Sequence, residues 1–482
     1  MMKSINLLIT FFAICSLSIA QSDVELRVIG GTYEDYASSI IPTPSGGVYA
    51  LGSTTSHGDG TVRGYVAYFD EDFNYAWSLL TPYGSSVENI VDGVLIEGTE
   101  DIKVLANRIG ENGTYNTTVH HITNLGTTGE VVSTFEIEDS ENQTPVALAT
   151  WQGNTYAFGD TEGDCWLINL DDEIAVSEGD YDVWGHPLMS ETVSSARVRN
   201  DTLYVAGTTV VDGVEQATVW VWGANGNTIW ANIGPDEDAY GDNYANDIAP
   251  FEGGATLHYS YQRDGEPIGN GIVRFSGGDG EPNGIVDTSG PYWVEGKRLI
   301  HYDDILLQLI QINYNSNSGT DMVLKRLTTY GSFINSTTFG SDFDEVPADF
   351  EIGDDGTVWV LGTTFGYLNG SSSICIYRLS TYDLLGSIEP EDISLGITND
   401  PMLYQSVVVE EQNVDLVLFP NPAKQATRLS KPADWILYST RGRICSSGYG
   451  DYVDLNGLSA GLYLVKAKLS NNTVVLPLRV VN

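Results

Sequence analysis

The sequence predicts an all-β protein in which a seven-bladed β-propeller is followed by a small C-terminal β-sandwich. A unit of about fifty residues with four strand-like segments recurs seven times between Val24 and Ile388. Helical periodicity is almost absent from these units, and turn residues separate short apolar runs. The charge of the chain also changes sharply near residue 417, which marks a second domain.

Residues 1–20 are expected to form a secretory signal peptide. Lys3 precedes an apolar run that is too short to span a bilayer, and small residues stand at the last and third-last positions. This pattern predicts cleavage between Ala20 and Gln21. No later segment has eighteen consecutive apolar residues, so the mature chain is expected to be exported without a transmembrane segment.

The repeat units of residues 21–388 are expected to be propeller blades. Each has a first apolar strand, a tight turn, a second strand ending in a small or polar residue, an alternating third strand and a fourth strand that often carries Trp. The marker at the end of the second strand falls about every fifty residues, at Gly52, Asn107, Gly159, Gly207, Ser260, Gln311 and Gly362.

A closed ring is favoured over a linear array because an array leaves its end faces exposed. The segment "VELRVIGG" (24–31) stands where the fourth strand of a preceding blade belongs, although no blade precedes it. We therefore expect it to pair with blade seven and close the ring, with residues 384–388 as the competing segment.

The repeats resemble a family of secreted propellers whose blades read D-x-A-x-S-I, D-G-G-Y, A-G-x-T and then a strand ending in L-D-x-x-G. Blade one matches most fully, and blades five and seven match in part, whereas blades two, three and six are degenerate. The matching residues of blade one are Asp35, Ala37, Ser39, Ile40, Gly46, Gly47, Gly52, Asp70 and Trp77. This resemblance implies an architecture and no particular activity.

The end of the chain is expected to form a linker at 389–416 and a separate β-domain at 417–482. The linker is acidic and contains Pro, whereas the last segment holds eight Lys or Arg and three Asp in a protein of net charge -43. Its strands alternate cleanly between apolar and polar residues, which is typical of a half-buried antiparallel sheet. Two prolines that flank Asn421 are expected to end its first strand sharply.

Residues 417–482 resemble the type A C-terminal sorting domain of the type IX secretion system of Bacteroidetes. The matching motif positions are Pro420, Asn421, Pro422, Gly442, Asp454, Gly461 and Tyr463. The resemblance implies passage through the periplasm, recognition by an outer-membrane translocon, and secretion or display on the outer cell surface.

Motifs for catalysis or metal binding are scarce. His120 and His121 are neighbours on a strand, so their side chains point to opposite faces and cannot share one metal ion. The three cysteines after the signal peptide are scattered, and no G-x-S-x-G motif occurs. We therefore expect no cofactor, with calcium as the one candidate ion, and no nucleic acid as a partner of so acidic a chain.

Acidic inter-blade connections provide the sequence-based hypothesis for a binding face. In a propeller these connections and the loops between second and third strands emerge on the same side. The candidate residues are Asp236, Asp238, Asp242, Asp342, Asp344 and Glu345. The favoured interpretation is a surface that only keeps the protein soluble. The alternative is a cation-assisted or basic-ligand binding face, with a glycan or a basic protein as the partner. The expected function is a non-catalytic binding or adhesion module, with a carbohydrate-active hydrolase or lyase as the alternative.

Overall fold

The computed structural model describes residues 24–481 apart from a set of short segments. Those segments are 57–59, 82–86, 111–112, 138–141, 162, 172–181, 185–188, 236–240, 263–266, 288–292, 314–318, 342, 367–370, 383–384, 386–392, 400–417, 420, 422, 440–443 and 470–471. The chain divides into two compact units, residues 1–407 and 408–482. The predicted signal peptide with Ala20 and Gln21 lies outside the described residues.

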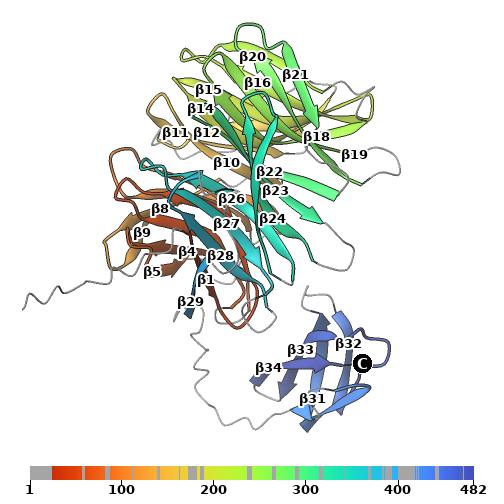
Figure 1. The fold of residues 1–482 in the computed structure, drawn as a ribbon. Coiled ribbons are helices and arrows are strands. Elements are labelled where there is room, and N and C mark those ends of the chain that lie inside the picture. Colours follow the sequence, from red (N-terminus) through yellow and green to blue (C-terminus); the bar gives the residue numbers. More distant parts are fainter. Residues whose placement is uncertain are drawn as a thin grey trace, which may run out of the picture. The chain divides into compact units, whose positions relative to one another are not determined.

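Seven sheets, here called blades one to seven, make up the first unit, and their four-stranded cores are antiparallel (Figure 1). Blade one contains β2 (Asp35–Pro42), β3 (Val48–Thr54), β4 (Arg63–Phe69) and β5 (Tyr75–Leu80). Blade two contains β6 (Glu88–Leu95), β7 (Ile102–Ile109), β8 (Tyr115–Asn124) and β9 (Gly129–Ile137). Blade three contains β10 (Gln143–Trp151), β11 (Asn154–Thr161), β12 (Asp164–Asn169) and β13 (Asp182–Trp184). Blade four contains β14 (Ser190–Arg199), β15 (Thr202–Val211), β16 (Val214–Trp222) and β17 (Thr228–Ile233).

The remaining blades complete the predicted number. Blade five contains β18 (Asp242–Phe251), β19 (Gly254–Gln262), β20 (Gly269–Ser276) and β21 (Pro282–Asp287). Blade six contains β22 (Trp293–Tyr302), β23 (Ile305–Asn313), β24 (Asp321–Thr328) and β25 (Phe333–Phe339). Blade seven contains β26 (Glu345–Ile352), β27 (Val358–Thr364) and β28 (Ser373–Leu379), together with β1 (Val24–Gly30) and β29 (Ile393–Asn399). The prediction of an all-β propeller is confirmed.

The N-terminal strand closes the ring, as the sequence predicted. β1 pairs antiparallel with β28, and β2 of blade one contacts β27 of blade seven. β29 then pairs in parallel with the other side of β1, so blade seven has five strands. The predicted linker at 389–416 was therefore wrong at its start, because Ile393–Asn399 belongs to the propeller. The acidic composition of this segment predicted a linker, whereas the structure shows a short strand that pairs with β1.

Phe73, in the loop after β4, contacts the strands that close the ring. Phe73 is fully buried, and its ring lies under the guanidinium groups of Arg27 and Arg378 at 4.8 and 5.1 Å. Arg27 also donates through Nε to the carbonyl oxygen of Phe73 at 3.2 Å, and Arg378 forms an ion pair with Glu25 of β1. Cation–π contacts and buried apolar area thus join blade one to the first and last segments of the ring.

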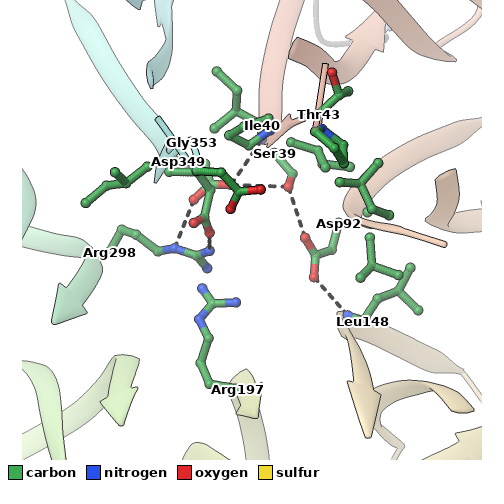
Figure 2. Close-up of a pocket in the computed structure, with 18 residues that line it drawn as sticks. Ser39, Ile40, Thr43, Asp92, Leu148, Arg197, Arg298, Asp349 and Gly353 are labelled. Atoms are coloured by element: carbon green, nitrogen blue, oxygen red, sulfur yellow. Dashed lines mark hydrogen bonds and ion pairs between the residues drawn. The ribbon is translucent and has the colours of Figure 1, made fainter. Parts of the chain in front are cut away.

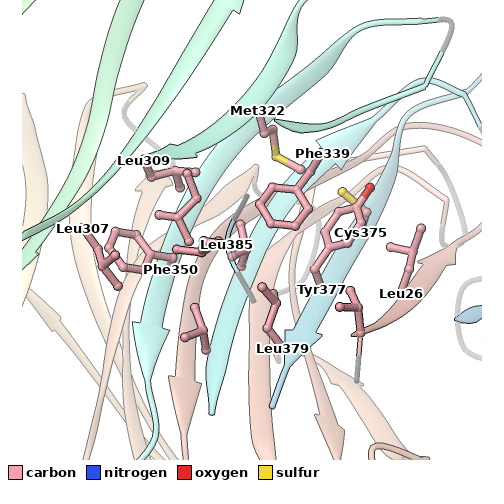
Figure 3. Packing of buried hydrophobic residues seen from close by; sticks show 14 of the residues in the cluster. Leu26, Leu307, Leu309, Met322, Phe339, Phe350, Cys375, Tyr377, Leu379 and Leu385 are labelled. Carbon is pink, nitrogen blue, oxygen red and sulfur yellow. The ribbon is translucent and has the colours of Figure 1, made fainter. Parts of the chain in front are cut away.

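Packing between blades supplies the core, as Figure 3 shows for the cluster around blades six and seven. Leu26 and Val28 of β1 pack there with Phe339, Phe350 and residues of the neighbouring strands. Each blade presents apolar side chains on both faces because both faces are covered by neighbouring blades. The ring therefore holds together through the hydrophobic effect, without a disulfide among the described residues.

Every first strand contains a β-bulge at the same place. The register shifts between Ala37/Ser39, Ile90/Asp92, Pro145/Ala147, Val193/Ser195, Ala245/Asp247, Gly296/Arg298 and Pro347/Asp349. The marker glycine of four blades lies opposite this bulge. A Cβ atom on Gly52 would lie 2.1 Å from the carbonyl oxygen of Tyr36, and one on Gly207 would lie 2.0 Å from that of Thr192. Glycine is therefore required there by a close backbone approach.

In the other three blades, the residue predicted to mark the end of the second strand lies one position after the residue opposite the bulge. The residues opposite the bulge are Ala106, Tyr259 and Ile310, each of which directly precedes the predicted marker. Without the glycine, nothing in the local pattern fixes the register of these second strands.

The second unit is a single hydrogen-bonded sheet whose ends meet. It contains β30 (Leu418–Phe419), β31 (Ala426–Ser439), β32 (Ile444–Asp454), β33 (Gly461–Leu469) and β34 (Asn472–Val480), with β30, β32 and β33 all pairing with β31. After β30 the chain crosses over, and Ala423 pairs in parallel with Val480 of β34. The sheet thus encloses a core that includes Leu429, Trp435 and Leu437.

Candidate functional site in the central channel

The residues that follow the bulges meet on the axis of the ring. A cavity of about 140 Å³ is lined by the seven of them, one from each blade. They are Ser39, Asp92, Ala147, Ser195, Asp247, Arg298 and Asp349. The bulge turns these side chains inward at one level, because it adds a residue and changes the side-chain alternation of the strand.

The three aspartates at this level bind the backbone of the next blade. Asp92 accepts a hydrogen bond from the backbone N–H of Leu148 at 2.8 Å, and Asp247 accepts one from Leu299 at 2.9 Å. Asp349 accepts one from Ile40 at 3.0 Å. The same contact occurs at three blade boundaries and satisfies a backbone donor in each case. These carboxylates therefore have a structural role in the ring.

The hydroxyl group of Ser39 links two of these carboxylates. Its Oγ lies 3.0 Å from Asp92 Oδ1 and 3.2 Å from Asp349 Oδ2. Burial raises the pKa of Asp92 and raises that of Asp349 to about 7, although Arg298 opposes the shift at both residues. Burial also raises the pKa of Asp247 to about 8. Burial therefore disfavours the charged form of all three channel carboxyl groups.

Arg298 neutralises one side of the channel. Its Nε lies 3.0 Å from Asp349 Oδ1 and 3.6 Å from Asp247 Oδ2, and its Nη2 contacts the carboxylate of Glu351. Burial disfavours the charge of the guanidinium, but Asp349, Glu351 and Asp92 outweigh burial and raise its pKa. Arg298 is thus a permanent cation whose charge is compensated by its neighbours.

A larger cavity of about 330 Å³ adjoins this level (Figure 2). It shares Ser39, Asp92, Arg197, Arg298 and Asp349 with the smaller cavity, and its further lining residues come later on the same strands. These include half-buried apolar residues and, at the first hairpin turns, the exposed residues Pro44 and Asp354. The cavity therefore lies in the channel on the side of these turns. Its volume matches that of a pocket for a small organic ligand.

Three of the acidic residues predicted from the sequence are described by the structure, and they lie on the opposite side of the ring, where the first strands begin. Asp242 and Asp344 are exposed, whereas Glu345 is fully buried. Asp236, Asp238 and Asp342 lie outside the described residues. Glu345 accepts hydrogen bonds from Ser341 and from Thr364 at 2.8 Å, and burial raises its pKa. Its carboxylate is bound within the protein and does not face solvent. The hypothesis of a binding face requires an exposed carboxylate, so Glu345 does not fit it.

The two exposed members of this set connect blades. Asp242 Oδ1 accepts from the backbone N–H of Glu215 at 3.2 Å, and Asp344 Oδ1 accepts from that of Thr320 at 2.8 Å. At the corresponding position of blade three, Asn142 accepts from the N–H of Tyr115 at 3.0 Å. Each contact joins the start of a first strand to the start of the third strand in the preceding blade. Short polar side chains at this position therefore serve the assembly of the ring.

The arginines of the channel were missed in the sequence. Lys and Arg total only 22 residues, and Arg197 and Arg298 stand in first strands that have no marker motif around them. An alignment of the seven bulges would have placed Arg298 at the position of Asp349 and Ser39. The bulges themselves become visible only in the strand register, so the sequence offered no direct signal.

Three of the predicted motif residues in the second unit make hydrogen bonds within that unit. Asn421 Oδ1 accepts from the backbone N–H of Arg479 at 2.9 Å, where the chain crosses from β30 to β34. Asp454 Oδ1 accepts from the N–H of Asn456 at 3.0 Å, and the hydroxyl group of Tyr463 donates to the carbonyl oxygen of Ser459. Gly461 begins β33. Pro420, Pro422 and Gly442 lie outside the described residues.

The two neighbouring histidines point to opposite faces, as predicted. His120 is fully buried and lies 3.1 Å from Glu88, whereas His121 lies 3.6 Å from Asp101. Within the described part of the chain, no group of three or more His, Cys, Asp or Glu side chains is arranged to hold a metal ion. The described residues also contain no helix long and apolar enough to cross a membrane.

Comparisons with known proteins concern the fold. No family model and no curated protein matches the chain. Similar solved structures include the β-propeller domain of the Trilobed protease from Pyrococcus furiosus, with 8% identity, a TM-score of 0.42, and coverage of 72% of this chain and 94% of that chain. BamB from Moraxella catarrhalis has 10% identity and a TM-score of 0.36, with 73% and 92% covered. The WD40 domain of SCAP from fission yeast has 8% identity and a TM-score of 0.38, with 75% and 99% covered. The propeller architecture follows from the seven sheets of this chain, and these similarities assign no ligand to it.

Proposed function

We propose that this protein is an exported binding protein that holds a small ligand in the channel of its propeller. The observation that carries this proposal is the cavity of about 330 Å³, which combines charged groups with half-buried apolar walls. Binding pockets typically combine a few oriented polar groups with apolar walls at about this volume. Loops and channel mouths of rigid rings are also where such folds present their functional residues.

A non-catalytic role is supported by the engagement of the channel carboxylates. Asp92, Asp247 and Asp349 each accept a backbone hydrogen bond from the following blade. A general acid or base needs a carboxyl group that can approach the substrate. Groups that hold the ring together are poorly placed for that task, because losing their bonds would leave buried backbone donors unsatisfied.

A carbohydrate-active enzyme is the second candidate. Asp92 and Asp349 lie on either side of the Ser39 hydroxyl group, and the pKa values of both carboxyl groups are raised. A pair of carboxyl groups that flanks the scissile bond is the common feature of glycoside hydrolases. Enzymatic release of sugar must therefore be measured together with binding.

Export by the type IX secretion system is the second part of the proposal. The motif residues of 417–482 support it, together with a separate C-terminal unit in which Asn421 fixes the crossing after β30. The signal peptide would deliver the chain to the periplasm, and the sorting domain would direct it through the outer membrane to the cell surface or the medium.

One array experiment tests the binding function. The purified mature protein is incubated with polysaccharides, cell-surface glycans and basic proteins, in calcium and in EDTA. Retention without new sugar ends is the expected result, whereas new sugar ends would establish the enzyme. Retention of no probe would contradict the binding function. A loss of retention in EDTA would identify calcium as a cofactor, and the acidic inter-blade connections would then be the first place to look for its site.

A fractionation experiment tests export. The full chain and a chain truncated after residue 407 are produced in a Bacteroidetes host, and periplasm, cell surface and medium are probed. The full chain is expected at the surface or in the medium, and the truncated chain in the periplasm. Equal release of both chains would refute the sorting function.

A further inference from the structure

Arg197 is a charged residue of the channel whose guanidinium group makes few contacts with the rest of the ring. It lies on β14 two residues after Ser195, and it lines both cavities. Figure 2 shows its side chain extending into the cavity toward that of Arg298. Its side chain is 22% exposed, so it is sheltered but accessible to a small molecule.

The charge of Arg197 is poorly compensated in comparison with that of Arg298. Its closest carboxylate is Asp247, with Nη2 and Oδ1 3.4 Å apart. Nη2 is buried and makes no hydrogen bond to the described residues, and Nη1 reaches only the carbonyl oxygen of Ala196 at 3.4 Å. Asp247 also accepts from Leu299, and burial disfavours its charged form by raising its pKa to about 8. A partly buried guanidinium with such partners favours an external anion.

The rest of the cavity limits which anion fits. Carboxylates of Asp92, Asp349, Glu351 and Asp354 line it, so a second negative charge on the ligand would meet repulsion. The same oxygens, and the hydroxyl group of Ser39, are suitable acceptors for ligand hydroxyl groups. Half-buried side chains of Pro42, Val94, Leu95 and Ile352 supply an apolar wall.

We propose that the cavity binds a small polyhydroxylated carboxylate, the chemical class of the sugar acids, and that Arg197 binds its carboxylate. The planar guanidinium matches a carboxylate in a two-point contact, and the acidic lining accepts the hydroxyl groups. This inference rests on the proposed binding function and specifies its ligand. Neutral sugars lack the group that Arg197 recognises, and phosphate brings more charge than the lining accommodates.

Calorimetric titration of the purified mature protein tests this assignment. The probes are sodium glucuronate, glucose and inorganic phosphate, and the variants are Arg197→Gln, Arg197→Lys and Arg199→Gln. Arg199 lies on the same strand and is exposed, but it does not line either cavity. It is therefore the matched control for a lost positive charge.

The expected result is binding of glucuronate in preference to glucose and phosphate. Arg197→Gln should weaken it by roughly 10- to 100-fold, as for loss of a hydrogen-bonded charged partner. Arg197→Lys should weaken it less, and Arg199→Gln should leave it unchanged. Thermal unfolding of each variant shows whether it folds. If Arg197→Gln does not fold, the affinity of Arg197→Lys decides the test.

Several results would overturn the assignment. Equal binding of glucose and glucuronate, tighter binding of phosphate, or unchanged affinity in folded Arg197 variants would each refute it. If the array retains a neutral glycan while glucuronate does not bind, the binding function stands and the ligand class is wrong. If no probe is retained on the array and none binds in the titration, the proposed function itself is refuted.

Discussion

Replacing Leu26 by alanine tests how the propeller is closed. Leu26 is a residue of β1 and is 2% exposed in the core around blades six and seven. Its register partner on β29 is Leu395, which is 49% exposed. The two leucines lie side by side on paired strands, yet only one lies in the core. Leu395→Ala is therefore a matched control for the same chemical change.

The expected magnitude follows from burial. Removing three carbon groups from a buried leucine costs about 2.4 kcal/mol in transfer free energy at about 0.8 kcal/mol each. The remaining cavity raises the loss to about 3–4 kcal/mol. At Leu395 half of the side chain already meets water and no closed cavity forms, so we expect a loss of about 1 kcal/mol or less.

Urea unfolding followed by tryptophan fluorescence measures both losses. Trp359 of blade seven is 2% exposed in the adjoining cluster, so it reports on this part of the ring. Leu26→Ala should lower the free energy of unfolding by about 2–3 kcal/mol more than Leu395→Ala does. An equal or larger loss for Leu395→Ala would mean that Ile393–Asn399, rather than Val24–Gly30, supplies the core strand of blade seven.

Three further predictions concern single side chains and their contacts. Burial lowers the pKa of His258 to about 3, so the unfolded chain takes up its proton first as pH falls. The wild type should therefore lose up to about 1.4 kcal/mol per pH unit relative to His258→Gln between pH 6.5 and 3, and parallel urea midpoints across this range would refute it. A Cβ on Gly296 would lie 2.4–2.5 Å from side-chain nitrogens of Asn246, Asn270 and His258, so Gly296→Ala should cost about 1–3 kcal/mol. Gly284→Ala, which meets nothing within 4 Å, should cost much less in the same assay. Asn421→Ala removes the acceptor for the Arg479 N–H and should destabilise the C-terminal unit by about 1 kcal/mol, and an unchanged melting temperature of that unit would contradict this role.

The candidate site shows where reading from sequence reaches its limit. Asp242, Asp344 and Glu345 were selected because acidic connections stood out in the composition. The structure uses their carboxylates to join blades or to satisfy donors within one blade. Local sequence reveals a charge but not its partner, because the partners Glu215, Thr320 and Thr364 lie nineteen to twenty-seven residues away.

The sequence by itself determined the elements that depend on local chemistry. The period of about fifty residues predicted seven blades. The unpaired segment at Val24 predicted the closing strand, because an apolar strand without neighbours requires a partner. Gly52 and Gly207 marked their second strands because a Cβ atom there would meet a backbone carbonyl group.

Only the tertiary structure decided what the ring does with these elements. The fifth strand of blade seven is defined by its pairing with β1, since its acidic flanks resemble a linker. The channel is defined by seven bulges whose following residues come from seven separate blades. Arg197 and Arg298 approach each other only when those blades close into a ring. Contacts between residues so distant in sequence depend on register and curvature, and neither quantity is encoded in a local pattern.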